Sequence, residues 1–408
     1  KEAREPHSPT AEPSSRVIRR DPLAGGPYPT LLLSKAQFDY GLDARGQRKP
    51  VPGPGKLVLV RKTPDGWRER VIEDPDCNVF HKAMVTDVVG DATGILTIGG
   101  TAAGLKLWRW RDAGWQVETL WQPTFGGKWD RLRDIEIGDV TGDGQPEMVI
   151  ATHDQGVVAV LRKQSDAWQV TEVHRAERTF VHEVEIGDVD GDGVNEFFTT
   201  PSQPNSATLV SQPGNIIMYR WTGDAFARNL VAALPQTHAK EIRAVDLAGD
   251  GPVSLVAAVE AQTARPNNAL VPLRPVEIFA YRFTEAGVQP RVLTSLPDTQ
   301  CRFLTSGDVD GDGRVEIVAA GMRSGLWLLQ NDDGVAWSKS LIDKHSSGYE
   351  HATLVGDLEG DGAVDIFVAS DVQGELRRYR WDGEDFRKEI ITSLPETEIT
   401  FNLAIGRY

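Results

Sequence analysis

The sequence predicts an all-β protein, a seven-bladed β-propeller, and three observations lead to this fold class. The first is a loop of nine residues, rich in aspartate and glycine, that recurs along the chain and is clearest at Asp188–Glu196 and Asp308–Glu316. The second is the spacing of its copies, close to fifty residues, which is typical of repeat architectures. The third is that each repeat contains four short apolar segments with the pattern of strands. Four strands per repeat around one axis form a propeller blade.

Six copies of the loop define six blades. They begin at Asp87, Asp139, Asp188, Asp246, Asp308 and Asp357, with separations of 52, 49, 58, 62 and 49 residues. In the repeat that contains Asp139, an expected inner strand over residues 133–138 precedes the loop. Expected strands over residues 147–152, 156–162 and 168–173 follow it. The other repeats have the same order.

The seventh blade is predicted to come from both ends of the chain. Residues 400–405 match an inner strand, since Phe401–Gly406 aligns with His351–Gly356, but no further strand follows. The missing strands are expected at the other end, at residues 30–34, 56–60 and 67–72. Pairing of the N-terminal strands with the C-terminal strand closes the ring and removes two open sheet edges.

The predicted propeller spans residues 27–408. Residues 1–26 are polar and contain proline, with nothing to bury, and are expected to form a disordered tether of the kind left after signal cleavage. Such a tether is also a place where a lipid can be attached.

Charge and composition narrow the partners and the compartment. The net charge of -15 and the pI near 5.1 argue against nucleic acid as a partner. No apolar run approaches the eighteen residues of a membrane helix. Calcium modules outside the cytosol bind in the micromolar to millimolar range, so we expect an extracytoplasmic location, which is periplasmic, cell-surface or secreted. The protein is expected to be a monomer. Cys77 and Cys301 precede non-adjacent blades and are expected to be free thiols.

The loop itself predicts structural calcium. The side chains at positions 1, 3 and 5, the carbonyl at position 7 and the carboxylate at position 9 form an all-oxygen shell suited to a hard cation. An EF-hand would need an acidic residue at position 12, where Thr199 and Ala319 stand. The copies at Asp87 and Asp246 lack ligands. The predicted ligands are Asp188, Asp190, Asp192, Val194 and Glu196; Asp308, Asp310, Asp312, Arg314 and Glu316; Asp139, Thr141, Asp143, Gln145 and Glu147; and Asp357, Glu359, Asp361, Ala363 and Asp365.

These loops resemble those of the FG-GAP/VCBS-type calcium propellers, a group that includes the integrin alpha-subunit head and many secreted bacterial proteins. The resemblance implies a calcium-binding propeller. It does not imply one function, because similar propellers occur in adhesion modules, in lectins, in rhamnogalacturonan lyases and in aldos-2-ulose dehydratase.

A candidate site lies six residues before each loop aspartate. The residues at these seven positions are His81, Arg133, His182, Lys240, Arg302, His351 and, in the closing blade, Phe401. All but Phe401 are basic or imidazole side chains. The next position adds Lys82, Asp134, Glu183, Glu241 and Asn402. The longest insertions, at residues 36–55, 201–214 and 262–274, are expected on the same face, where binding residues concentrate. Residues in or beside the strand-connecting loops of this face that are expected to lean inward are Lys35, Gln37, His153, Asp154, Gln203, Glu260 and Arg323.

This composition suggests an anion site with proton-transfer groups. Cationic side chains in an acidic molecule attract a carboxylate or another anion. Histidine titrates near neutrality and serves as general base or acid, or as a ligand for a transition metal such as zinc. The first hypothesis is therefore an enzyme that acts on an acidic or oxidised carbohydrate by elimination, as a lyase or dehydratase. The alternative is a non-catalytic module that binds a glycan or a protein.

The two groups of candidate residues follow from that hypothesis. The catalytic candidates are His182, His351 and His81, with His182 preferred as the base because Glu183 is its neighbour. The substrate-binding candidates are Arg133, Lys240, Arg302, Lys35, Glu183, Glu241 and His153.

Overall fold

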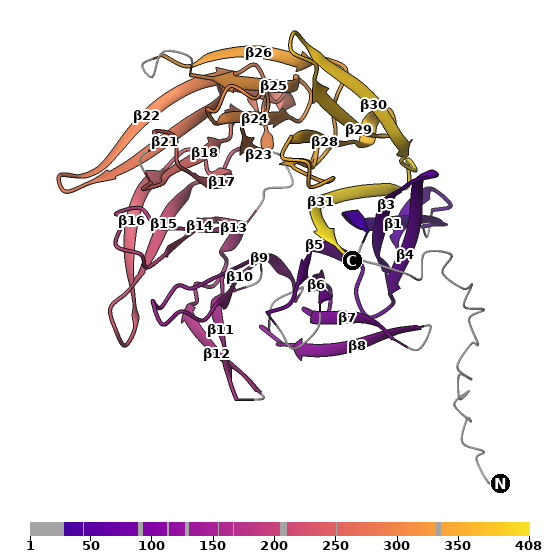
Figure 1. Cartoon of the computed structure of the whole chain (residues 1–408), viewed down its shortest axis with the longest axis horizontal. Coiled ribbons are helices and arrows are strands. Elements are labelled where there is room, and N and C mark those ends of the chain that lie inside the picture. The colour runs from indigo at the N-terminus through magenta and orange to yellow at the C-terminus, as the bar shows by residue number, and fades with distance from the viewer. Residues whose placement is uncertain are drawn as a thin grey trace.

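A computed structural model describes residues 28–43, 45–88, 93–111, 114–126, 130–153, 155–165, 167–204, 210–249, 251–331 and 336–408. These residues form seven antiparallel sheets arranged around a central axis, as Figure 1 shows. The prediction of an all-β, seven-bladed propeller is confirmed. The predicted tether, residues 1–26, lies outside the described residues.

Each blade has four main strands, and the strands of each blade are named in order from the axis outward. Blade one consists of β5 (Val79–Thr86), β6 (Gly94–Gly100), β7 (Leu105–Arg111) and β8 (Gly114–Trp121). Blade two consists of β9 (Leu132–Gly138), β10 (Glu147–Thr152), β11 (Val158–Gln164) and β12 (Ala167–His174). Blade three consists of β13 (Phe180–Gly187), β14 (Glu196–Ser202), β15 (Gly214–Trp221) and β16 (Phe226–Leu234).

The next three blades repeat this order. Blade four consists of β17 (Ala239–Val245), β18 (Ser254–Val259), β21 (Val276–Thr284) and β22 (Gly287–Leu296). Blade five consists of β23 (Cys301–Gly307), β24 (Glu316–Gly321), β25 (Gly325–Gln330) and β26 (Ser338–Asp343). Blade six consists of β27 (Thr353–Gly356), β28 (Asp365–Ser370), β29 (Glu375–Trp381) and β30 (Phe386–Ser393).

Blade seven joins the two ends of the described chain, as the sequence predicted. It consists of β31 (Glu398–Arg407), β1 (Pro29–Leu42), β3 (Gly55–Thr63) and β4 (Gly66–Asp74). The ladder between β1 and β31 runs from the Pro29–Arg407 pair to the Gln37–Glu398 pair. Figure 1 shows β31, in yellow, beside the indigo strands of this blade.

Three insertions extend one face of the ring. The far end of β1 pairs with β2 (Arg48–Pro52), and β19 (Gln262–Ala264) pairs with β20 (Val271–Arg274) around the short 3-10 helix η1 (Pro266–Asn268). The third insertion follows β14. It contacts the insertion that contains β19 and β20, because the backbone N–H of Ser211 donates to Thr263 Oγ1 at 2.8 Å. A second 3-10 helix, η2 (Asp371–Gln373), lies between β28 and β29.

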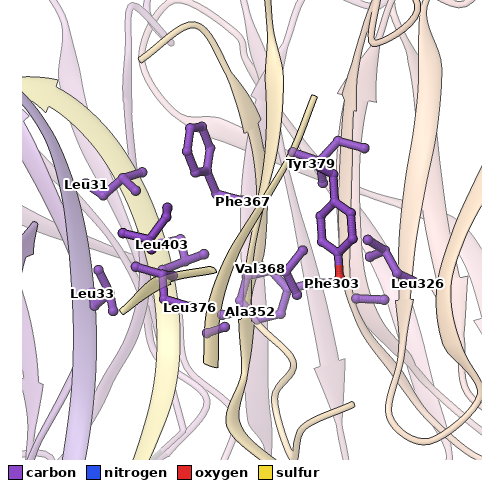
Figure 2. Close-up of a cluster of buried hydrophobic side chains, with 14 of the residues drawn as sticks. Leu31, Leu33, Phe303, Leu326, Ala352, Phe367, Val368, Leu376, Tyr379 and Leu403 are labelled. Atoms are coloured by element: carbon purple, nitrogen blue, oxygen red, sulfur yellow. The ribbon is translucent and has the colours of Figure 1, made fainter. Parts of the chain in front are cut away.

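The core lies between neighbouring blades. Inner-middle strands such as β10 and β14 are buried along their whole length, because a blade covers each of their faces, whereas the outer strand β12 has exposed residues along its length. Figure 2 shows one such interface, in which Leu33 and Leu403 of blade seven lie near Phe367 of blade six. Close approach also requires glycine before Asp188, since a Cβ on Gly187 would lie 2.7 Å from the Cβ of Ala244.

Cys77 and Cys301 are free and buried, as predicted. In the described residues no helix is long and apolar enough to cross a membrane.

Candidate functional site

A β-bulge recurs in the inner strands at the predicted site position. The register shifts between Phe80 and Lys82, between Val181 and Val184, and between Cys301 and Phe303. Blades four and seven have the same irregularity. A bulge adds one residue to a strand and re-aims its side chain, so the repeat itself turns the residue six before each loop aspartate out of the regular alternation.

The inner strands surround a central channel of about 360 Å³ whose wall has two unlike halves. Blades one to four contribute most of its charged side chains: Lys82, Arg133, Asp134, Glu136, Glu183, Glu185, Glu241 and Arg243. Blades five to seven contribute mainly apolar or neutral ones, including Phe303, Leu304, Leu354, Val355, Phe401 and Leu403. The channel therefore presents an acidic, ion-paired wall opposite an apolar one.

Cations hold the carboxylates of the charged wall together. Lys82 Nζ lies 2.9 Å from Asp134 Oδ1 and 2.5 Å from Glu136 Oε1. Burial disfavours its charge, but these two carboxylates outweigh burial and raise the pKa of Lys82. The pKa of Glu183 and of Glu241 is raised well above the usual value, first by burial and then by neighbouring carboxylates.

Arg302 and Glu350 form the centre of a second, buried layer near the insertion face. Arg302 Nη1 donates to Glu350 Oε1 at 2.6 Å, and its guanidinium lies 4.2 Å from the ring centroid of Tyr349. Arg133 reaches this layer from blade two, 3.4 Å from Glu183 and 3.8 Å from Glu350. Among the described residues, Arg302 Nε and Glu350 Oε2 make no hydrogen bond, although Arg133 Nη2 is 3.8 Å from Glu350 Oε2, so the layer retains unused bonding capacity.

Lys240 enters the same layer and, within the described residues, has one hydrogen-bond partner. Its Nζ donates to His182 Nδ1 at 2.9 Å, and Lys240 is only 3% exposed. On the other side of the ring, Ser202 Oγ lies 2.8 Å from His182 Nε2. Because Ser202 donates its hydroxyl proton to the carbonyl of Gln203, its oxygen accepts from His182, which fixes the proton on Nε2 and leaves Nδ1 as an acceptor.

The environment of Lys240 disfavours an ammonium ion. Burial, followed by the charges of Arg302 and Arg133, lowers its pKa to about 7, against a smaller opposing effect of Glu260 and Glu350. The pKa of His182 is lowered well below 6.5 by burial and then by Lys240.

Four histidines form an arc over blades one to four. The ring centroids of His81 and His153 lie 6.3 Å apart, those of His153 and His182 5.1 Å, and those of His182 and His238 5.2 Å. Burial is the main cause of their lowered pKa values, about 3 for His81 and about 4 for His238. In the part of the chain that the structure describes, Nδ1 of His153 makes no hydrogen bond.

Two of the predicted site residues lie apart from this cluster. His351 is fully buried, with Nε2 2.8 Å from Ser346 Oγ and Nδ1 2.7 Å from the carbonyl of Gly321. Lys35 is paired with Glu398 at 2.5 Å. The structure therefore does not bring His81, His182 and His351 together, and within the described residues no group with metal-ligand spacing includes a histidine. Asp154 lies outside the described residues.

Sequence reasoning missed the carboxylate that faces the axis in blade six. Glu350 stands one residue before His351, whose φ of 57° turns the backbone at this point. In blade six the inner strand β27 begins only at Thr353, so Glu350 lies in the irregular backbone before it, which the alignment of inner strands did not cover. His238 was also missed, and it lies 3.8 Å from Glu260.

The acidic loops lie at the opposite ends of the inner strands. Two groups of carboxylates have ligand atoms within 4.8 Å of one another and can hold a metal ion: Asp188, Asp190 and Glu196, and Asp308, Asp310 and Glu316. Their donors are all oxygens, as the loop motif requires. Loop backbone N–H groups bind the first aspartate, as from Gly193 to Asp188 at 2.9 Å.

Arginines from the third strand of the blade occupy three of the four predicted loops. Arg162 lies 2.8 Å from Asp143 and 3.1 Å from Glu147, and Arg220 lies 2.8 Å from Asp190 and 2.9 Å from Glu196. Arg380 contacts Asp365 in the same way. In the fourth loop the corresponding residue is Gln330, which donates to Asp310 Oδ2 at 2.9 Å.

Comparison with known proteins agrees with the fold. The FG-GAP-like repeat matches residues 139–199 and 308–368. The chain thus carries FG-GAP-like repeats in a seven-bladed β-propeller, as the resemblance of its loops implied. None of the curated proteins matches the sequence.

Two solved structures have a similar architecture. A protein from Lactobacillus plantarum is 10% identical, with a TM-score of 0.55 over 93% of this chain and 99% of that one. A putative 6-phosphogluconolactonase from Bacteroides fragilis is 11% identical, with a TM-score of 0.53 over 97% of this chain and 100% of that one. At these identities the likeness is one of fold alone.

Proposed function

We propose that this protein is an extracytoplasmic, calcium-stabilised propeller that acts on an acidic or oxidised carbohydrate by elimination at the axial site of its insertion face. The observation that carries the proposal is the buried layer of Arg133, Lys240 and Arg302, with unpaired polar atoms on Arg302 and Glu350. A guanidinium recognises a carboxylate through paired hydrogen bonds, and these three cations are each less than a tenth exposed. A carboxylate next to an acidic C–H is the feature that an elimination reaction needs.

The proposed division of labour follows from the contacts. Arg302 would bind the substrate anion, since its Nε is unpaired and the exposed ring of Tyr349 lies over its guanidinium. Lys240 and His182 form the hydrogen-bonded pair available for proton transfer. The calcium loops lie away from this layer and would act only on stability.

The experiment is a screen of uronate polysaccharides and oxidised monosaccharides for the ultraviolet absorbance of an unsaturated product. Arg302→Gln should weaken substrate binding by about 10- to 100-fold, because one charge-assisted hydrogen bond contributes about 1.5–3 kcal/mol. Combining it with Glu350→Gln removes both charges of the pair and controls for a stranded carboxylate. Product formation that is unchanged in Arg302→Gln would refute this assignment.

The second candidate is a non-catalytic binding module for a glycan or a protein. It is favoured by the apolar side chains that the insertions expose, including Tyr40 at 47%, Leu42 at 76% and Leu273 at 58%. Saturable binding of a uronate oligosaccharide without any product from the screen would support this candidate over the enzyme.

A further inference from the structure

Lys240 is anomalous among the buried cations of this protein. Within the described part of the chain it forms no ion pair, and its single hydrogen bond goes to a neutral imidazole. Lys82, Lys106 and Lys35, by contrast, are each paired with a carboxylate within 3.0 Å. A buried ammonium without a counter-ion is costly, and the usual outcome is a neutral amine.

The groups around Lys240 keep the amine neutral and direct it. Arg302 and Arg133 contribute positive charge, whereas the carboxylates of Glu260 and Glu350 contribute less than burial and the arginines together. His182 offers Nδ1 as an acceptor, since its Nε2 proton is committed to Ser202. His153 Nε2 lies 3.2 Å from the same atom and shares it with Lys240. One N–H of the Lys240 amine therefore donates to His182, and the lone pair of the amine is directed away from His182.

We propose that Lys240 is a nucleophilic amine that forms an imine with a small carbonyl compound bearing an anionic group. This inference deepens the proposed function, on which it rests for the use of the same face, and names its substrate class as a 2-oxo acid or an oxidised sugar with an acidic group. The anion would pair with Arg302. Because Lys240 is 3% exposed, the carbonyl must belong to a small molecule or to the end of a chain.

The chemical step balances without any further reactant. The lone pair of Nζ adds to the carbonyl carbon, and the π electrons of the C=O bond move to oxygen. The nitrogen loses one proton, for which His182 Nδ1 is in position at 2.9 Å, and the oxygen gains one. Loss of the hydroxyl group with a second proton, as water, leaves the C=N bond.

The test is reductive trapping with pyruvate as the probe. The full chain is incubated with pyruvate and sodium cyanoborohydride, digested, and mapped by mass spectrometry. Label should concentrate on Lys240 at least 10-fold over exposed lysines, and its rate should rise with pH through about 7, where the amine loses its proton. Lys240→Arg should lose this label, and Lys163→Met, a change at an exposed position of β11, should keep it.

Three further outcomes make the test specific. Propanal, which has no carboxylate, should label Lys240 less than pyruvate does, and Arg302→Gln should remove that preference. Label spread evenly over the exposed lysines, or a rate at Lys240 that does not change around pH 7, would overturn the inference. If trapping succeeds but no uronate yields an unsaturated product, the elimination proposal fails while the reactive amine stands. If a uronate yields an unsaturated product but Lys240 is not trapped, the reactive amine is rejected and the elimination proposal stands. Melting curves of each variant show whether the site has remained folded.

Discussion

The four acidic loops should differ in calcium affinity, because three of them already contain an arginine. At the Asp188 loop, an incoming ion must displace Arg220 from Asp190 and from Glu196. At the Asp308 loop, where Asp308, Asp310 and Glu316 form the cluster, it must displace one hydrogen bond, from Gln330 to Asp310. Arg314 pairs with Asp312 of the same loop, outside that cluster. The sequence alone ranked these two loops as equals.

The size of the difference can be worked from these contacts. The two contacts of Arg220 are ion pairs on a side chain that is 40% exposed and screened by solvent, and each such pair contributes about 1 kcal/mol. Two pairs amount to about 2 kcal/mol, against about 1 kcal/mol for the single hydrogen bond from Gln330. The difference of about 1 kcal/mol corresponds to roughly 5-fold in Kd.

The perturbation is to exchange the two residues. Gln330→Arg should weaken calcium binding at the Asp308 loop about 5-fold, and Arg220→Gln should strengthen binding at the Asp188 loop by a similar factor. Both changes are measured by calorimetric titration of chelator-treated protein. Ser340→Arg adds the same charge on the neighbouring strand and should have little effect. The melting temperature in calcium should change in the same direction as the affinity, since an ion at 100 times its Kd stabilises the folded state by about 2.7 kcal/mol. An unchanged titration of Gln330→Arg would refute the reasoning, and melting that excess chelator does not alter would refute calcium stabilisation as a whole.

Two further predictions concern stability. Deleting residues 400–408 removes most of the strand that pairs with β1, so we expect aggregation or loss of cooperative unfolding, and a parent-like melting curve would contradict ring closure. For pH, His81 has a folded-state pKa of about 3, lowered by burial and by Arg133, so below about pH 6.5 the unfolded state binds a proton that the folded state does not. Stability should therefore fall as pH drops from about 6.5 towards 3, by roughly 1.4 kcal/mol per pH unit for this one group, and His81→Gln should flatten the change in urea unfolding between pH 7 and pH 5.

The sequence by itself determined the number of blades, the closure of the ring and the position of the acidic loops. These features depend on local patterns: the loop motif requires glycine at its turns, and strand alternation follows from the two-residue period of the backbone. The match between residues 400–405 and the other inner strands was enough to predict the seventh blade, since only strands at the other end of the chain could complete it.

Only the tertiary structure decided what the polar residues do. Arg133, Lys240 and Arg302 appeared equivalent in the repeat, yet Arg133 and Arg302 are paired with carboxylates and Lys240 is not. Arg220 and Gln330 appeared to be ordinary strand residues until the register placed each opposite the last carboxylate of its loop. The physical reason is that a side chain's charge state and direction depend on burial and on partners about 20 to 60 residues away, which no local pattern encodes.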